Sequence, residues 1–394
     1  MRRNCWFTLS MSVVVAMFAG AARAEDGGRN GAVRLVKTIP VPGHMVVFDI
    51  SFVDPATQLY YLADRSHKVI DVIDAKRDVF VKQIAGGFKG FTGNNDTSGP
   101  NGVVVSGKFL FVTDANSRIV TIDLTTDKIV SEVSTGGAPG LRADELAYDP
   151  EDGLLLPVNN ADDPPFATLI KVDKKTGKLA VLNRITFANA TNGAEQPVWD
   201  AGTGKFYISI PELNHDVSDG AVGRISTKGV LETLFHVKNC QPAGLSLGPR
   251  QDLLLGCSAV FDTAGNPWTS ASPTTAAPSQ VIMDAKTGKI DRVVPGVGGS
   301  DEVWFNEGDG RYYTASRNNP GGPVLGVIDA EDQTLVQVVP TFNTPASSPP
   351  PRGTTHSVAA NPHNNHVFVP LPANNVFPAC LDGCIAVFGA PRDD

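Results

Sequence analysis

The stretch that decides the fold runs from Asp49 to Ile84 and reads DISFVDPATQLYYLADRSHKVIDVIDAKRDVFVKQI. It contains four short apolar segments, at residues 49–55, 59–64, 69–74 and 79–84. Short, mostly polar stretches at 56–58, 65–68 and 75–78 separate them, and the segments are too short for ordinary helices. The stretch therefore predicts four short β-strands joined by tight turns.

The same order of segments recurs along the chain. Copies begin at Asn101 and Asp144, and further units begin near Glu195, Ala243, Asp301 and His356. The third segment ends in an apolar pair followed by Asp, as in Val72-Ile73-Asp74, and leads into turns that contain Gly. A unit of this size that is repeated seven times is the mark of a repeat architecture.

Seven units of four strands predict an all-β fold, a seven-bladed β-propeller of four-stranded blades. The last unit, from His356, contains only three candidate strands. The N-terminal segment 33–40 can supply the missing outer strand, which would complete the last blade and cover both open edges of the array. A β-sandwich is the alternative fold, but it needs neither a regular unit nor a displaced N-terminal strand.

The N-terminus resembles an export signal. Arg2 and Arg3 precede an apolar run at 13–18, and Ala22-Arg23-Ala24 has the small residues of a cleavage site. Residues 1–24 are therefore expected to be a signal peptide and residues 25–394 a single propeller domain, in a periplasmic or secreted protein. No later stretch has roughly 18 uninterrupted apolar residues, so the protein is not expected to be membrane-embedded.

The charge balance bears on the partners. The chain has 41 Asp and Glu against 33 Lys and Arg, a formal net charge of −8. Binding to nucleic acid needs clustered cations that replace counterions on phosphates, so no nucleic-acid partner is expected. A small molecule or a periplasmic protein is the expected partner.

Four of the five cysteines lie beyond the expected signal peptide. An even number of cysteines in an exported chain favours disulfides. Cys240 and Cys257 fall at the start of one predicted strand and the end of its neighbour, and Cys380 and Cys384 could close a small loop. A metal site is the alternative, although neither pair has a second pair at zinc-ribbon spacing.

Two motifs indicate a family. Phe111-Val112-Thr113-Asp114 with Asn116, and Pro100-Asn101-Gly102-Val103-Val104-Val105 before it, resemble the YVTN repeat. The chain is thus similar to YVTN-repeat, YncE-like periplasmic propellers over almost its whole mature length. This resemblance implies functions from passive binding to the metal-dependent, lactonase-like hydrolysis of esters.

Aligning the units on their first strands places one residue of each blade at an equivalent position, and six of the seven are polar. If these positions face the channel, they could bind a divalent cation such as Ca²⁺ or Zn²⁺. The predicted metal ligands are Asp49, Asn101, Asp144, Glu195 and Asp301, and the sixth polar residue is His356. Alternatively, they are solvated side chains at strand starts, where Asp and Asn form local turn bonds. Glu145 and Glu302 follow ring carboxylates, and strand alternation predicts that they point the other way.

Four residues in the loops after the second strands are predicted ligand contacts: Arg65, Asn116, His215 and Arg317. Asn116 can also be explained as a turn residue that tolerates left-handed backbone. Two long inserts, at 261–280 and 343–355, could be solvated loops or a lid over one face.

Two functions follow from these residues. The first is a binding or scaffold protein that uses the channel face for a small ligand, a metal or a protein partner. The alternative is a metal-dependent hydrolase in which Asp144, Glu195 and Asp301 hold the metal and His356 is the catalytic general base. Electron-transfer or quinone chemistry is less favoured, because the chain has no Cys-x-x-Cys-His motif.

Overall fold

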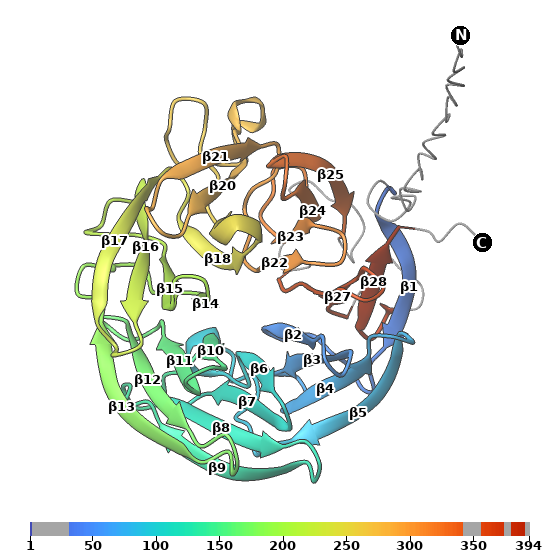
Figure 1. The fold of residues 1–394 in the computed structure, drawn as a ribbon, viewed down its shortest axis with the longest axis vertical. Coiled ribbons are helices and arrows are strands. Elements are labelled where there is room, and N and C mark those ends of the chain that lie inside the picture. The colour runs from blue at the N-terminus through green and yellow to red at the C-terminus, as the bar shows by residue number, and fades with distance from the viewer. Residues whose placement is uncertain (2–30, 342–355, 374–379, 391–394) are drawn as a thin grey trace.

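The structure, a computed structural model, describes Met1 and residues 31–341, 356–373 and 380–390. Its described strands form seven four-stranded antiparallel sheets, which are arranged as blades around a central axis (Figure 1). The predicted all-β, seven-bladed propeller is thereby confirmed. Apart from Met1, the expected signal peptide lies outside the described residues, as does the insert at 343–355.

Each blade runs from an inner strand beside the axis to an outer strand at the rim. From the inner strand outwards, the first six blades consist of β2 (Ser51–Asp54), β3 (Leu59–Asp64), β4 (Val69–Asp74) and β5 (Val79–Ala85); β6 (Val103–Ser106), β7 (Phe109–Asp114), β8 (Arg118–Asp123) and β9 (Lys128–Ser134); β10 (Leu146–Asp149), β11 (Leu154–Asn159), β12 (Phe166–Val172) and β13 (Leu179–Thr186); β14 (Pro197–Asp200), β15 (Lys205–Ile210), β16 (Asp219–Ser226) and β17 (Leu231–Lys238); β18 (Pro242–Leu247), β19 (Asp252–Cys257), β20 (Ser279–Asp284) and β21 (Ile290–Pro295); β22 (Val303–Asn306), β23 (Arg311–Ser316), β24 (Val324–Asp329) and β25 (Thr334–Pro340).

The seventh blade joins the two ends of the fold. Its strands are β26 (Ala359–Asn361), β27 (His366–Leu371), β28 (Cys384–Gly389) and, on the outside, the N-terminal β1 (Arg34–Pro40). In the β1–β28 pair, Thr38 lies opposite Ala386 and Ile39 opposite Ile385, and Ile39 is buried. The predicted closure is therefore confirmed: β1 pairs with the edge that β28 would otherwise expose.

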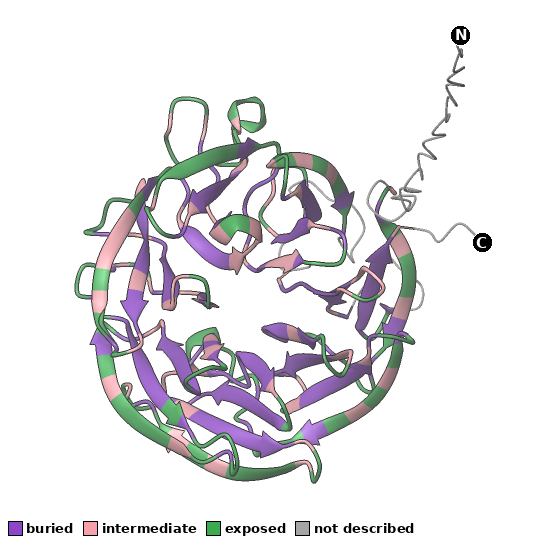
Figure 2. Cartoon of the chain, viewed as in Figure 1, coloured by how far each residue is buried: buried purple, intermediate pink, exposed green. Residues whose placement is uncertain are grey.

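The hydrophobic core lies between the blades. Leu156 and Val158 of β11, for example, belong to the same buried cluster as Phe206 and Ile208 of β15 in the next blade. The outer strands alternate mostly between exposed and half-buried positions, whereas the inner three strands of each blade are mostly buried (Figure 2). Each blade thus depends on its neighbours to remove its apolar faces from water.

Aspartates shape the repeated turns as the sequence predicts. Oδ1 of Asp284 accepts a hydrogen bond from the Thr287 backbone N–H at 2.7 Å, and Gly288 closes that turn with a φ of +72°. The helical elements in the described residues are three short 3-10 turns: η1 (Asn95–Thr97), η2 (Pro249–Gln251) and η3 (Pro273–Thr275). None of the helices in the described part of the chain has the length and apolarity that crossing a bilayer requires.

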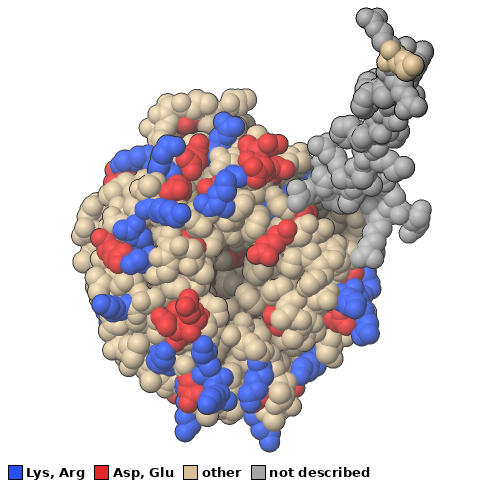
Figure 3. All heavy atoms as spheres, in the orientation of Figure 1, with Lys and Arg blue, Asp and Glu red and all other residues tan. Residues whose placement is uncertain are grey.

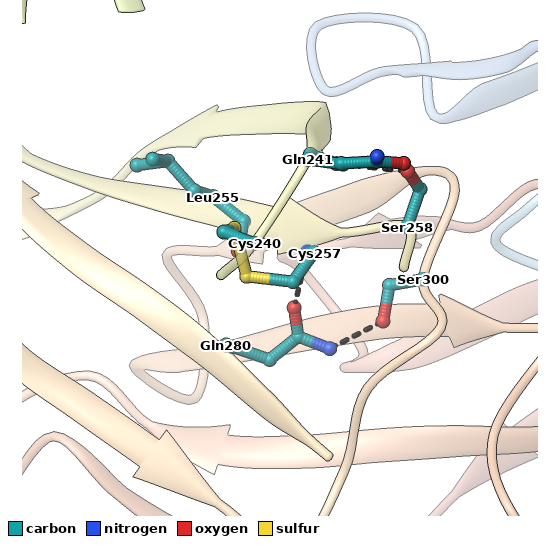
Figure 4. The surroundings of a disulfide bond; sticks show 7 residues. All are labelled: Cys240, Gln241, Leu255, Cys257, Ser258, Gln280 and Ser300. Atoms are coloured by element: carbon teal, nitrogen blue, oxygen red, sulfur yellow. Dashed lines mark hydrogen bonds between the residues drawn. A yellow bond between two sulfur atoms is a disulfide. The ribbon is translucent and has the colours of Figure 1, made fainter. Parts of the chain in front are cut away.

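Both predicted disulfides form, Cys240–Cys257 and Cys380–Cys384. The first joins the residues flanking the β18–β19 hairpin and is surrounded by polar contacts (Figure 4). The Cys257 backbone N–H donates to Oε1 of Gln280 at 2.8 Å, and the Gln280 side-chain amide donates to Ser300 Oγ. These buried bonds tie the second strand of this blade to β20 and to the chain that leads into the sixth blade.

Candidate functional site

The polar residues predicted to form a ring meet at one end of the central channel, at the starts of the inner strands. His356, which precedes β26, contacts carboxylates from two other blades. Its Nε2 lies 2.6 Å from Oδ1 of Asp49, and its Nδ1 lies 2.7 Å from Oδ2 of Asp301. Asp49 precedes β2 and Asp301 precedes β22. The imidazole therefore connects the first, sixth and seventh blades.

Two predicted ligand contacts, Arg65 and Arg317, belong to the same group. The buried guanidinium of Arg65, in the β3–β4 loop, contacts the Asp49 carboxylate and donates to Asn101 Oδ1 from Nε at 3.0 Å and from Nη2 at 2.7 Å. Nη2 of Arg317, in the β23–β24 loop, lies 2.6 Å from Asp301 Oδ2. Charge-assisted contacts of this kind are stronger than neutral hydrogen bonds, so they hold these loops against the channel.

Arg142 is a third cation in this group, and sequence reasoning missed it. It lies between β9 and β10, and its Nη2 is 2.6 Å from Asp144 Oδ2, while its Nη1 is 3.6 Å from Asp49 Oδ2. The signal was present in the triplet Arg142-Ala143-Asp144, because residues two apart in an extended segment share a face. The channel end is thus a network of alternating cations and anions.

The network controls the protonation of its histidine. Burial lowers the pKa of His356, and so does the charge of Arg317, whose Nη1 lies 2.7 Å from His356 Nδ1. The Asp301 carboxylate and hydrogen bonds to Asp301 and Asp49 outweigh both and raise the pKa to about 9. Burial opposes the ionisation of Asp301, yet Arg317 and His356 lower its pKa to about 2. At neutral pH His356 is therefore an imidazolium held between two carboxylates.

On the other side of the ring, two acids are harder to ionise. Burial raises the pKa of Asp144 to about 6 although Arg142 opposes the shift. Burial and the Asp144 charge raise the pKa of Glu195 to about 8, again against Arg142. Glu195 is therefore mostly protonated at neutral pH and can donate a hydrogen bond.

The predicted metal centre stays a prediction. Asp49, Asp144 and Asp301 contact guanidinium or imidazolium groups in this structure. Within residues 31–341, 356–373 and 380–390, no three His, Cys, Asp or Glu side chains are grouped so as to hold a metal ion. A bound cation would have to displace at least one arginine, because like charges repel at such short range.

The other two predicted ligand contacts lie in exposed loops. Asn116 has a φ of +62° in the turn between β7 and β8, and His215 has a φ of +61° in the loop between β15 and β16. Both side chains are exposed, and neither contributes a contact described above for the ring. The backbone at Asn116 matches the alternative interpretation of this residue as a turn former.

Below the ring, the channel widens into a cavity of about 400 Å³. Inner-strand residues of the first six blades line it, from Ile50 and Glu145 near the strand starts to Ser106 and Pro150 at their ends. Figure 3 shows the hollow at the centre of the ring of blades, with most Lys and Arg side chains towards the rim. The volume falls within the range of about 300–1,000 Å³ that is common for small-molecule sites.

The prediction that Glu145 points the other way from Asp144 does not place Glu145 outside the channel. Glu145 lines the cavity together with its neighbours Leu146, Ala147 and Tyr148. Consecutive residues border the cavity because the inner strand is the edge of its blade, so side chains from both of its faces reach the channel. Alternation along a strand separates two faces of a sheet, but it does not remove an edge residue from the channel.

Glu145 and Glu302 form a buried acid pair just inside the ring. Glu145 precedes β10 and Glu302 precedes β22, and these strands lie on opposite sides of the centre (Figure 1). Each of the two carboxyl groups influences the pKa of the other. Burial and then Glu302 raise the pKa of Glu145 well above its usual range, and burial and then Asp301 raise that of Glu302 to about 8.

Comparison with known proteins supports the fold. No family model matches the chain, and no curated protein matches it in sequence. A chain in the structure of Kuenenia stuttgartiensis hydrazine synthase is similar with a TM-score of 0.64 and 13% identity, over 90% of this chain and 97% of that chain. At so low a sequence identity, the similarity shows only that the two chains share a fold. The chain is a seven-bladed β-propeller, and its relation to the YVTN-repeat proteins stays a prediction.

Proposed function

We propose that this chain is an exported, YncE-like propeller of the YVTN-repeat class that binds a small ligand in its central channel. The observation that carries the proposal is the open cavity of about 400 Å³ that inner strands from six blades line. Concave, mostly apolar sites with a few convergent polar groups are the usual form of ligand sites. The two disulfides are consistent with a periplasmic or secreted location.

Binding suits the electrostatics of the ring better than general-base catalysis. His356 has a pKa raised to about 9, so at neutral pH it carries the proton that a general base would have to accept. Both ring nitrogens already have partners: Nε2 contacts Asp49, and Nδ1 lies 2.7 Å from both Asp301 Oδ2 and Arg317 Nη1. The group is therefore suited to hold charge in a fixed arrangement at one end of the site.

A metal-dependent hydrolase, the lactonase-like alternative, stays a second candidate. One observation favours it: Asp144 and Asp301 are close enough to Glu195 for their charges to raise its pKa. Elemental analysis of the purified protein tests this candidate directly. Stoichiometric Ca or Zn that is lost in Glu195→Gln/Asp301→Asn would support it, and a metal-free protein with no thermal response to either ion would exclude it.

The binding proposal is tested by filling the cavity. Val198 lines the cavity and is half-buried, so Val198→Trp should occupy the ligand volume. Val293→Trp, on the exposed side of β21, is the matched control. A small-molecule library would be screened by thermal shift against both variants and the wild type.

We expect compounds that raise the melting temperature of the wild type and of Val293→Trp but leave Val198→Trp unchanged, because only the latter lacks space for them. Compounds that stabilise all three proteins equally bind elsewhere. If every stabilising compound behaved in that way, the channel would not be the ligand site.

A further inference from the structure

An unpaired buried oxygen marks the inner end of the cavity. The Glu145 side chain is only 5% exposed, and its Oε2 has no hydrogen-bond partner among the described residues. Its carboxyl group faces that of Glu302 from the opposite blade. Leaving a buried carboxyl oxygen unpaired is costly, so this end of the cavity is complementary to a hydrogen-bond donor that the described part of the chain does not supply.

Aromatic side chains form much of the remaining wall. Phe52 and Trp304 meet edge to face, with ring centroids 5.6 Å apart, and Tyr148, Trp199 and Phe305 also line the cavity. All five are half-buried, so part of each ring is open to solvent. The faces of such rings carry negative electrostatic potential and attract cations.

The acid pair favours a cation over a neutral donor. The three arginines at this end of the channel, Arg65, Arg142 and Arg317, lie in ion pairs with aspartates of the ring. A positive ligand charge at the pair would stabilise the ionised carboxylate, and it would lie beside aromatic rings whose faces attract cations.

We propose that the cavity binds a hydrophobic organic ammonium ion, with its nitrogen at Glu145, beside Glu302, and its apolar body against Phe52, Trp304 and their aromatic neighbours. This inference rests on the proposed channel-binding function and specifies the ligand class. The ammonium group donates to the free Oε2 of Glu145, and the apolar body covers the half-buried rings, which removes their surface from water.

The test compares two probes of the same shape by calorimetry on the mature, disulfide-bonded chain. The probes are 2-phenylethylamine, which is a cation, and 2-phenylethanol, its neutral isostere. We expect the amine to bind at least about tenfold more tightly than the alcohol.

Two variants test whether Glu145 and Glu302 recognise the charge of the amine. Glu145→Gln and Glu302→Gln keep the shape of the side chains and should each weaken amine binding by about tenfold or more, with little effect on the alcohol. Glu132→Gln, on the outer strand β9, is the matched control and should bind like the wild type. Trp304→Leu, which shortens the aromatic wall, should weaken both probes and provides a second measurement if an acid-pair variant misfolds.

The outcomes separate this inference from the proposed function. Equal affinity for amine and alcohol, no amine binding up to about 10 mM, or amine binding unaffected by Glu145→Gln would each overturn the ammonium assignment. If other compounds still bound to the wild type and Val198→Trp blocked their binding, the channel-binding proposal would stand and only the ammonium assignment would fail. If no compound were blocked by Val198→Trp, both proposals would fail.

Discussion

His356→Gln should remove a pH-dependent part of the stability of the propeller. The histidine has a pKa raised from 6.5 to about 9 in the folded protein, where it lies between Asp49 and Asp301. A raised pKa means that the folded state binds the proton more tightly than the unfolded state does. The resulting stabilisation is complete below pH 6.5 and disappears as the pH rises through 9.

Linkage gives the size of the effect. A shift from 6.5 to about 9 corresponds to about 3 kcal/mol near pH 6, falls to about 2 kcal/mol near pH 7.5 and approaches zero near pH 10. The His356 side chain is 17% exposed, so solvent screening reduces these values only modestly. Gln cannot titrate, so the difference between wild type and variant isolates the histidine from the other buried acids.

The assay is urea unfolding of both proteins at several pH values between about 6 and about 10, with linear extrapolation to water. His236→Gln, on the exposed face of β17, controls for the loss of a histidine as such. The free-energy difference between wild type and His356→Gln should shrink steadily as the pH rises. A difference that stayed constant within about 0.5 kcal/mol would refute the imidazolium assignment.

Three further changes probe other parts of the fold. Arg142→Met leaves Asp144 buried without its cation and should cost about 3–5 kcal/mol of unfolding free energy, whereas Arg77→Met at an exposed pair should cost less than about 1 kcal/mol; equal losses would contradict the network. Replacing Cys240 and Cys257 by Ser opens a loop with a sequence separation of 17 and should cost about 3 kcal/mol, unless the reduced wild type is already as stable as the oxidised protein. Ile39→Asp buries a charge in the closing strand and should lower the melting temperature far more than Val36→Asp, whose site is exposed; similar shifts would argue against closure by β1.

The blades and their closure could be predicted because they depend on local patterns. The strand segments of 49–84, the Asp-containing turns and the three-strand remainder after His356 are all visible in the order of residues. The Cys240–Cys257 bond was predictable for the same reason, because a hairpin brings the ends of neighbouring strands together. Position within a repeat also placed Asp49, Asp301 and His356 at one end of the channel.

The partners of these residues could not be predicted from one blade at a time. Arg65 joins Asp49 to Asn101 of the next blade, and Glu145 meets Glu302 from the opposite side of the ring. A sequence repeat shows which residues occupy equivalent positions in the blades. It does not show how far each side chain extends towards the channel axis. The aromatic wall was missed for the same reason, since Phe52 and Trp304 are ordinary strand residues in the sequence.

The sequence by itself thus determined the number of blades, the order of strands, the closing strand and the disulfide pairs, since each follows from periodicity or from neighbours along the chain. Only the tertiary structure decided which charges neutralise one another, which acids stay protonated and where the apolar cavity lies. Ionisation depends on burial and on charges within a few ångströms. In a closed ring of blades, those distances are set by residues that lie far apart in the chain.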